Sequence, residues 1–140
     1  MKSRTLPCTC LVSACLAGLC TRYDGTLKEN RNCLKRLEEF IWIPVCPEQL
    51  GGLATPREPA EIVGGDGMSI LNGRGRVISR SGADITDAFI KGANQVLDIA
   101  ARQGIRKIFL KSRSPSCGVG EILGVTAALL LLHGYDVEEF

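Results

Sequence analysis

Apolar and polar residues recur with two different periods along the chain, and the pattern predicts strands that alternate with helices. Short apolar runs at 8–13, 41–46 and 105–111 are typical of buried strands. Residues 31–40 and 84–103 instead carry their apolar side chains at helical spacing. This order of strand, helix, strand and helix predicts a parallel sheet with helices packed on its faces.

The ends of these elements carry their own signals. Asp84 can cap the first amides of the helix at 84–103, and Gly104 supplies a left-handed stop. Residues 125–132 are apolar almost all round, which predicts a deeply buried helix closed by Gly134. Residues 135–137 are compatible with a last strand. Pro44 removes a ladder donor, so we expect the strand at 41–46 to lie near an edge of the sheet.

The middle of the chain is richer in turn residues. Residues 14–25 are expected to be a loop with room for one helical turn, and 47–67 to be loop, because small residues, prolines and glycines are frequent there. Within 68–79, Asn72-Gly73 stands between two apolar pairs and predicts a small hairpin. The expected fold is a single α/β domain over residues 1–140. It is a three-layer, Rossmann-like parallel sheet with helices on both faces and a small hairpin.

Composition narrows the possible partners. The chain has 140 residues, enough for one hydrophobic core. Its net charge of +2 gives no reason to expect a polymeric nucleic acid as partner. Its longest apolar run, 125–132, is far shorter than the roughly 20 residues of a membrane helix, so no membrane association is expected. Composition leaves the oligomeric state open.

Seven cysteines are unusual for this length. The odd number argues against a closed disulfide framework, so we expect reduced thiols and a cytoplasmic protein. An alternative is a lipoprotein leader, because Lys2 and Arg4 precede an apolar stretch that ends at Cys15. Pro7 and Thr9 interrupt that stretch, which favours a strand at 8–13 instead.

Three of the cysteines stand close to the ends of predicted strands. Cys15 follows the first strand, Cys46 ends the second, and Cys117 comes shortly after the third. Because the carboxyl ends of parallel strands share one edge of the sheet, these three thiols should converge there. We expect Cys8, Cys10 and Cys33 to be buried structural residues. The sequence assigns no role to Cys20.

Three converging thiolates are compatible with two kinds of centre. One is a zinc ion with an open fourth position, and the other is an iron–sulfur cubane with one iron free of protein ligands. In either centre the open position can admit a substrate. A non-catalytic structural or sensing module that binds zinc or a cluster is the alternative.

Six segments stand out along the chain: Leu11-Val12-Ser13-Ala14-Cys15-Leu16, Arg22-Tyr23-Asp24-Gly25, Pro44-Val45-Cys46-Pro47-Glu48, Gly51-Gly52-Leu53 with Thr55-Pro56-Arg57, Ser112 to Gly118, and Gly124-Val125-Thr126-Ala127-Ala128-Leu129. Taken together and in this order, they resemble the DUF523 family, whose characterised members are 2-thiouracil desulfurases. One feature departs from the family. The segment from Val119 to Leu123 is short, where the family usually carries a longer loop with a Tyr-Asp-Gly piece.

The resemblance implies a [4Fe-4S] cluster held by Cys15, Cys46 and Cys117, with the fourth iron open. It also implies an enzyme that removes sulfur from a small thiolated pyrimidine such as 2-thiouracil without net redox change. Water would replace the sulfur at the ring carbon. Glu48 is then the best candidate for acid–base catalysis, and Ser114 matches the serine expected to contact substrate. Asp24 is a weaker catalytic candidate.

Overall fold

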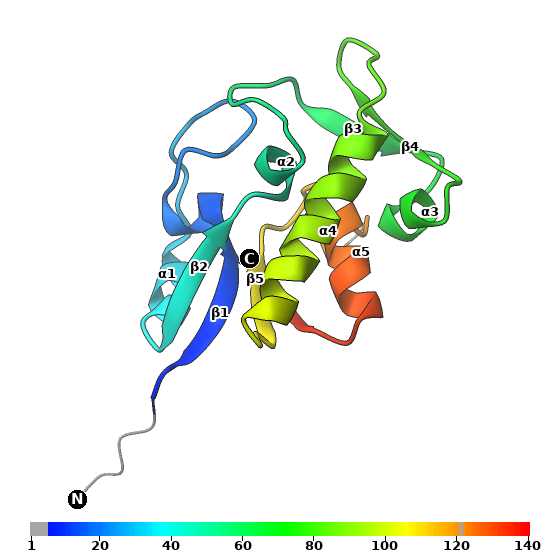
Figure 1. Cartoon of the computed structure of the whole chain (residues 1–140). Helices are drawn as coiled ribbons and strands as arrows, with labels where there is room; N and C mark the ends of the chain where they lie inside the picture. Colours follow the sequence, from blue (N-terminus) through cyan, green and yellow to red (C-terminus); the bar gives the residue numbers. More distant parts are fainter. Residues whose placement is uncertain (1–5, 121) are drawn as a thin grey trace, which may run out of the picture.

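The computed structural model describes residues 6–120 and 122–140. Its main sheet has four parallel strands in the order β2-β1-β5-β6 (Figure 1). The strands span Cys8–Ser13 (β1), Phe40–Val45 (β2), Lys107–Leu110 (β5) and Asp136–Glu139 (β6). The predicted parallel sheet is confirmed, and β2, which contains Pro44, is an edge strand as expected. Lys2 and Arg4 of the alternative leader lie outside the described residues, whereas 8–13 form the inner strand β1.

Helices cover both faces of this sheet, as the three-layer prediction requires (Figure 1). Helix α1 (Arg31–Leu37) packs on one face, and helices α4 (Thr86–Arg102) and α5 (Val125–Leu132) pack on the other. Successive residues of β1 point to opposite faces. Leu11 therefore joins the core under α4 and α5, while Cys10 and Val12 join the core under α1.

The predicted signals at the ends of α4 are present. Oδ1 of Asp84 accepts a hydrogen bond from the amide of Thr86 at 3.0 Å, so it caps the first residue of the helix. Gly104 has a φ of 63°, and the amide of Ile105 bonds back to the carbonyl of Ala100 at 2.9 Å. A residue with a Cβ would be strained in this left-handed turn.

The small antiparallel pair is present, but the prediction that it spans 68–79 is wrong. Strand β4 (Arg76–Ser79) pairs with β3 (Ala60–Val63), and helix α3 (Gly67–Leu71) lies between them. The helix forms because Asp66 and Ser69 make a reciprocal capping box. This cap stabilises a helix where the apolar pairs around Asn72-Gly73 had indicated a strand. Asn72-Gly73 ends this helix and forms no hairpin turn.

Two short elements lie in segments expected to be mostly loop. Helix α2 (Pro47–Leu50) follows β2 directly, and the 3-10 helix η1 (Ala14–Ala17) follows β1. The backbones of α2 and α4 are in direct contact, because Gly51 and Gly92 lie where the two helices meet and have no side chains. A Cβ at Gly92 would collide with the carbonyl of Pro47, so only glycine allows this approach. Among the described residues, no helix is long and apolar enough to cross a membrane.

Candidate functional site

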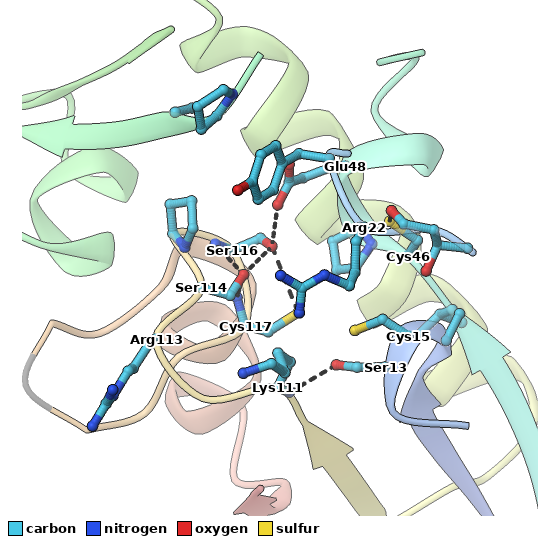
Figure 2. Close-up of a pocket in the computed structure, with 18 of the residues that line it drawn as sticks. Ser13, Cys15, Arg22, Cys46, Glu48, Lys111, Arg113, Ser114, Ser116 and Cys117 are labelled. Atoms are coloured by element: carbon cyan, nitrogen blue, oxygen red, sulfur yellow. Dashed lines mark hydrogen bonds between the residues drawn. The ribbon is translucent and has the colours of Figure 1, made fainter. Parts of the chain in front are cut away.

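A cavity of about 430 Å³ opens at the carboxyl ends of β1, β2 and β5, within the size range typical of small-molecule sites. Cys15 reaches it from η1, Cys46 from the residue between β2 and α2, and Cys117 from the loop after β5. Figure 2 shows the side chains of Cys15 and Cys117 pointing toward one another. The structure thus brings to one cavity the three cysteines that strand order predicted to converge.

The three thiols surround the cavity and do not meet at one point. In the part of the chain that the structure describes, no three His, Cys, Asp or Glu side chains are close enough to hold a single metal ion. One zinc ion would need all its sulfur ligands within about 2.3 Å of its centre. A cluster places a different iron against each thiolate, so its ligands can stand farther apart.

Burial raises the pKa of two of these thiols. The pKa of Cys117 rises to about 12 because the side chain is removed from water, although hydrogen bonds from the hydroxyls of Ser13 and Ser116 oppose the rise. Burial, and then the neighbouring Cys46, raise the pKa of Cys15. Both groups are therefore protonated thiols in the metal-free protein, and binding a metal centre must release their protons.

Glu48 lies in the first turn of α2, and its side chain is only 13% exposed. Its Oε2 accepts a hydrogen bond from the hydroxyl of Ser116 at 3.1 Å. The Ser116 hydroxyl is also 3.0 Å from that of Ser114, which itself accepts from the amides of Ser116 and Cys117. Glu48 and Ser114, the two leading candidates for the chemistry, are therefore connected through Ser116 (Figure 2).

Glycines and Ser13 fix the loop that carries these serines. Gly124 lies so close to the backbone of Ser116 that a Cβ there would be in steric conflict with it. Oγ of Ser13, the last residue of β1, accepts from the amide of Lys111 at 2.9 Å. The loop after β5 is thus tied to the end of β1, which keeps Cys117 and Cys15 on the same cavity.

Among the described residues that line the cavity, Arg57 has the most extensively bonded side chain. Its side chain is 9% exposed, and its Nε donates to Oε1 of Glu48 at 2.9 Å. Its Nη2 donates to the carbonyl of Thr21 at 3.0 Å and lies 3.9 Å from Sγ of Cys46. Sequence reasoning named Arg57 only together with Arg22 and Arg113, as arginines able to bind a carboxylate or balance the charge of a cluster, and it did not select Arg57 among them.

Asp24 is not brought to the cavity. Its Oδ1 accepts from the amide and the hydroxyl of Thr26 at 3.1 and 2.7 Å, and these hydrogen bonds lower the pKa of Asp24. The neighbouring Arg22 does line the cavity. Its buried Nε has no hydrogen-bond acceptor among the described residues, since Oδ1 of Asp24 is 3.6 Å away. Asp24 therefore makes a local turn and forms an ion pair with Arg22 from outside the cavity lining.

The remaining cysteines divide by exposure. Cys10 on β1 and Cys33 on α1 are fully buried between the sheet and this helix, as expected of structural residues. Cys8 is exposed at the start of β1, so the expectation that it is buried is wrong. The first residue of an inner strand can lie beyond the helices that cover the sheet. Cys20 is exposed and does not line the cavity.

The cavity carries an excess of positive charge. Its lining includes five basic side chains and one carboxylate, and that carboxylate, Glu48, is paired with Arg57. The basic residues are Arg22, Lys28, Arg57, Lys111 and Arg113. Figure 2 shows the side chain of Arg113 directed away from the three thiols. The charges of Lys111 and Arg22 favour the thiolate of Cys15, but burial outweighs them and the pKa of Cys15 is raised.

The short segment after Cys117 is held by the end of the sheet. The amides of Val119 and Gly120 both donate to Oε2 of Glu139, at 2.8 and 3.2 Å. Residue 121, in the middle of this segment, lies outside the described residues.

A parallel α/β domain with three thiols and a buried carboxylate at the carboxyl edge of its sheet has the features of a metal- or cluster-dependent enzyme. The family model described as 2-thiouracil desulfurase matches residues 10–138. The chain belongs to this family, as the motifs in its sequence predicted.

Two relatives agree with this assignment. The uncharacterized protein YbbK of Bacillus subtilis (strain 168) is 42% identical over 139 residues, which cover 91% of this chain and 92% of YbbK. The solved structure of the [4Fe-4S]-dependent thiouracil desulfidase TudS (DUF523Vcz) is 40% identical and superposes with a TM-score of 0.80. That similarity covers 94% of this chain and 90% of the TudS chain.

Proposed function

We propose that this protein is a [4Fe-4S]-dependent desulfurase that removes the sulfur of a small thiolated pyrimidine such as 2-thiouracil, without net redox change. The observation that carries the proposal is the cavity itself. Three thiols from three strand ends line it, next to the hydrogen-bonded set of Glu48, Ser116 and Ser114. Family membership and the similarity to TudS support the same activity.

Cys15, Cys46 and Cys117 would each hold one iron of the cluster and leave the fourth iron without a protein ligand. The similarity to the [4Fe-4S]-dependent thiouracil desulfidase TudS supports a cluster over a single zinc ion. When bound, the cluster supplies a soft Lewis acid with an open position suited to the sulfur of a thiocarbonyl group. A hydrogen bond from Nη2 of Arg57 would stabilise the thiolate of Cys46.

Glu48 would handle the protons of the exchange. Conversion of a thiocarbonyl to a carbonyl by water releases hydrogen sulfide, so atoms balance with no electron donor or acceptor. The carboxylate of Glu48 would take a proton from the water that adds to the ring carbon and return it to the departing sulfur. Ser114 would orient the pyrimidine, since its hydroxyl lies at the cavity wall beside Ser116.

The number of cysteines supports a proposal for the compartment. All seven are free thiols in the structure. Reduced thiols in this number are typical of a reducing environment, and we propose the cytoplasm. The expected partner is the small-molecule substrate.

The test is an anaerobic reconstitution with iron and sulfide, followed by incubation with 2-thiouracil. We expect a brown protein with broad absorption near roughly 400 nm, and equal amounts of sulfide and uracil formed over many turnovers. A protein that acquires the cluster but forms neither product would contradict the enzyme function and favour a sensing or structural module. A colourless protein that retains only zinc would contradict the cofactor.

A further inference from the structure

We propose that Arg57 is a positioning residue of this site: it holds Glu48 in the orientation that lets this carboxylate serve Ser116 and the substrate. The inference rests on the proposed function, because it assigns a role within that reaction. Arg57 is not placed on the reacting atoms. It acts through Glu48.

The bonding of the Glu48 carboxylate supports this role. One oxygen, Oε1, is taken by Nε of Arg57 at 2.9 Å, and the other, Oε2, faces the hydroxyl of Ser116 at 3.1 Å. Both side chains of the ion pair are nearly buried, at 9% and 13% exposure. A buried carboxylate with a fixed partner on one oxygen has few other orientations available, so the second oxygen stays directed at Ser116.

The same guanidinium also fixes the wall opposite Glu48. Nη2 of Arg57 donates to the carbonyl of Thr21, and the backbone amide of Arg57 donates to the carbonyl of Tyr23 at 2.6 Å. The carbonyl of Thr21 also accepts from Sγ of Cys46 at 3.8 Å. Arg57 therefore connects three parts of the chain: the loop between η1 and α1, Cys46 at the end of β2, and helix α2.

The contacts form a continuous chain between two of the proposed cluster ligands. It runs from Sγ of Cys46 to Arg57 (3.9 Å), to Glu48 (2.9 Å), to Ser116 (3.1 Å) and to Sγ of Cys117 (3.6 Å). Glu48 stands in the middle of this chain. Its position is thus set relative to both sulfurs, and Arg57 supplies the link on the Cys46 side.

Lysine could not make the same set of contacts. Arg57 uses all three of its nitrogens: Nε on Glu48, Nη1 on Oγ1 of Thr55 at 2.8 Å, and Nη2 on Thr21. A guanidinium presents its donors in a rigid planar fork, whereas an ammonium is a single point charge on a flexible stem. Arg57→Lys should therefore retain the charge and lose part of the positioning.

The test is a double-mutant cycle between Arg57→Gln and Glu48→Gln in the cluster-loaded enzyme, with 2-thiouracil as substrate. We expect Arg57→Gln alone to lower kcat about 50-fold with KM changed less than about threefold, because it disturbs proton transfer more than binding. In the Glu48→Gln background the same change should lower kcat by less than about threefold. Arg57→Lys should lie between wild type and Arg57→Gln.

The matched control is Arg76→Gln. Arg76 also pairs with a carboxylate, Asp84, at 3.3 Å, but that pair is exposed and neither residue lines the cavity. This change should leave kcat within about twofold. Equal fold losses from Arg57→Gln in both backgrounds, or an Arg57→Gln enzyme with full kcat, would overturn the inference.

A second readout uses the metal-free protein and does not depend on activity. The urea midpoints of the same four variants should be non-additive, with Arg57→Gln lowering the midpoint much less once Glu48 is neutral. Additive midpoints would overturn the inference even if activity were lost. A wild-type enzyme that forms no sulfide would instead contradict the proposed function, and the urea cycle would still decide the role of Arg57.

Discussion

Two groups of cysteines differ in their surroundings. Cys10 on β1 and Cys33 on α1 lie in the core between the sheet and this helix, with Val12, Leu37 and Phe109. Cys15, Cys46 and Cys117 line the cavity at the carboxyl edge of the same sheet. Burial raises the pKa in both groups, to about 11 for Cys10 and to about 12 for Cys117. Neither burial nor pKa therefore tells a structural thiol from a functional one.

The difference lies in what surrounds each thiol. The pair under α1 packs against apolar side chains. The cavity thiols have polar neighbours instead, such as the hydroxyl of Ser116 at 3.6 Å and Nη2 of Arg57 at 3.9 Å. Polar groups and open volume next to a thiol give a bound metal centre hydrogen bonds and room, whereas an apolar core gives only packing.

The largest effect should come from removing one cavity thiol. We expect Cys117→Ala to abolish cluster binding and lower sulfide formation by at least about 10³-fold, because one iron loses its ligand. The matched change Cys10→Ala should retain the cluster and most of the activity, and should lower the free energy of unfolding by about 1–2 kcal/mol. Iron content, activity and urea midpoints measure the contrast. Equal losses of iron in the two variants would remove the distinction between the groups.

Glu48→Gln comes next in size. This substitution retains the shape of the side chain and removes the proton acceptor, so we expect kcat to fall by about 10²–10³-fold. Cluster absorption should be unchanged, since no sulfur ligand is altered. Glu39→Gln, at an exposed position, is the control and should have no effect on kcat. A Glu48→Gln enzyme with full turnover would mean that the carboxylate does not handle the proton.

Ser116→Ala should have a smaller effect of about 10-fold on kcat. It breaks the hydrogen bond from Ser116 to Glu48 and leaves both Glu48 and Ser114 in place. Ser81→Ala is a close control, because the Ser81 hydroxyl also donates to a glutamate, Glu58, but outside the cavity. Similar kinetics for the two alanine variants would show that the link through Ser116 contributes nothing.

The smallest expected effect concerns pH. The pKa of Cys10 and of Cys33 rises from 9.0 to about 11 in the folded protein, first because of burial. Below pH 9.0 these thiols are protonated in both states and their stabilising contribution is complete. Between pH 9.0 and about 11 the unfolded chain ionises first, so stability falls as pH rises. In metal-free protein Cys10→Ala should therefore flatten this decline in urea midpoint. If the urea midpoint fell equally with pH in the wild type and the variant, this prediction would be contradicted.

The sequence predicted the sheet well because its strands are short apolar runs and its main helix has clear end signals. Its errors in secondary structure lie mainly in the segment 47–79. One local capping motif and one long-range packing contact decide the structure there. The Asp66–Ser69 capping box makes a helix where Asn72-Gly73 indicated a hairpin. Similarly, α2 forms directly after Cys46 because Gly51 and Gly92 allow it to pack against α4, a contact between residues far apart in the sequence.

For the site, strand order was enough to predict that Cys15, Cys46 and Cys117 share a cavity. It could not identify Arg57, whose importance depends on hydrogen bonds to Thr21 and Glu48 from a distant loop. Nor could it show that Asp24 bonds locally to Thr26 and stays out of the cavity. Spacing along the chain predicts which strand end carries a residue, but not the direction of a side chain in a loop.

The central claim, that these three cysteines alone hold one cluster, is tested most directly by native mass spectrometry of anaerobically reconstituted protein. The account predicts a mass increase of a single [4Fe-4S] cluster in the wild type and in variants with alanine at Cys10, Cys20 or Cys33. The same increase should be absent when alanine replaces Cys15, Cys46 or Cys117. An increase matching one zinc ion in the wild type, or a cluster retained without one of these three cysteines, would contradict it.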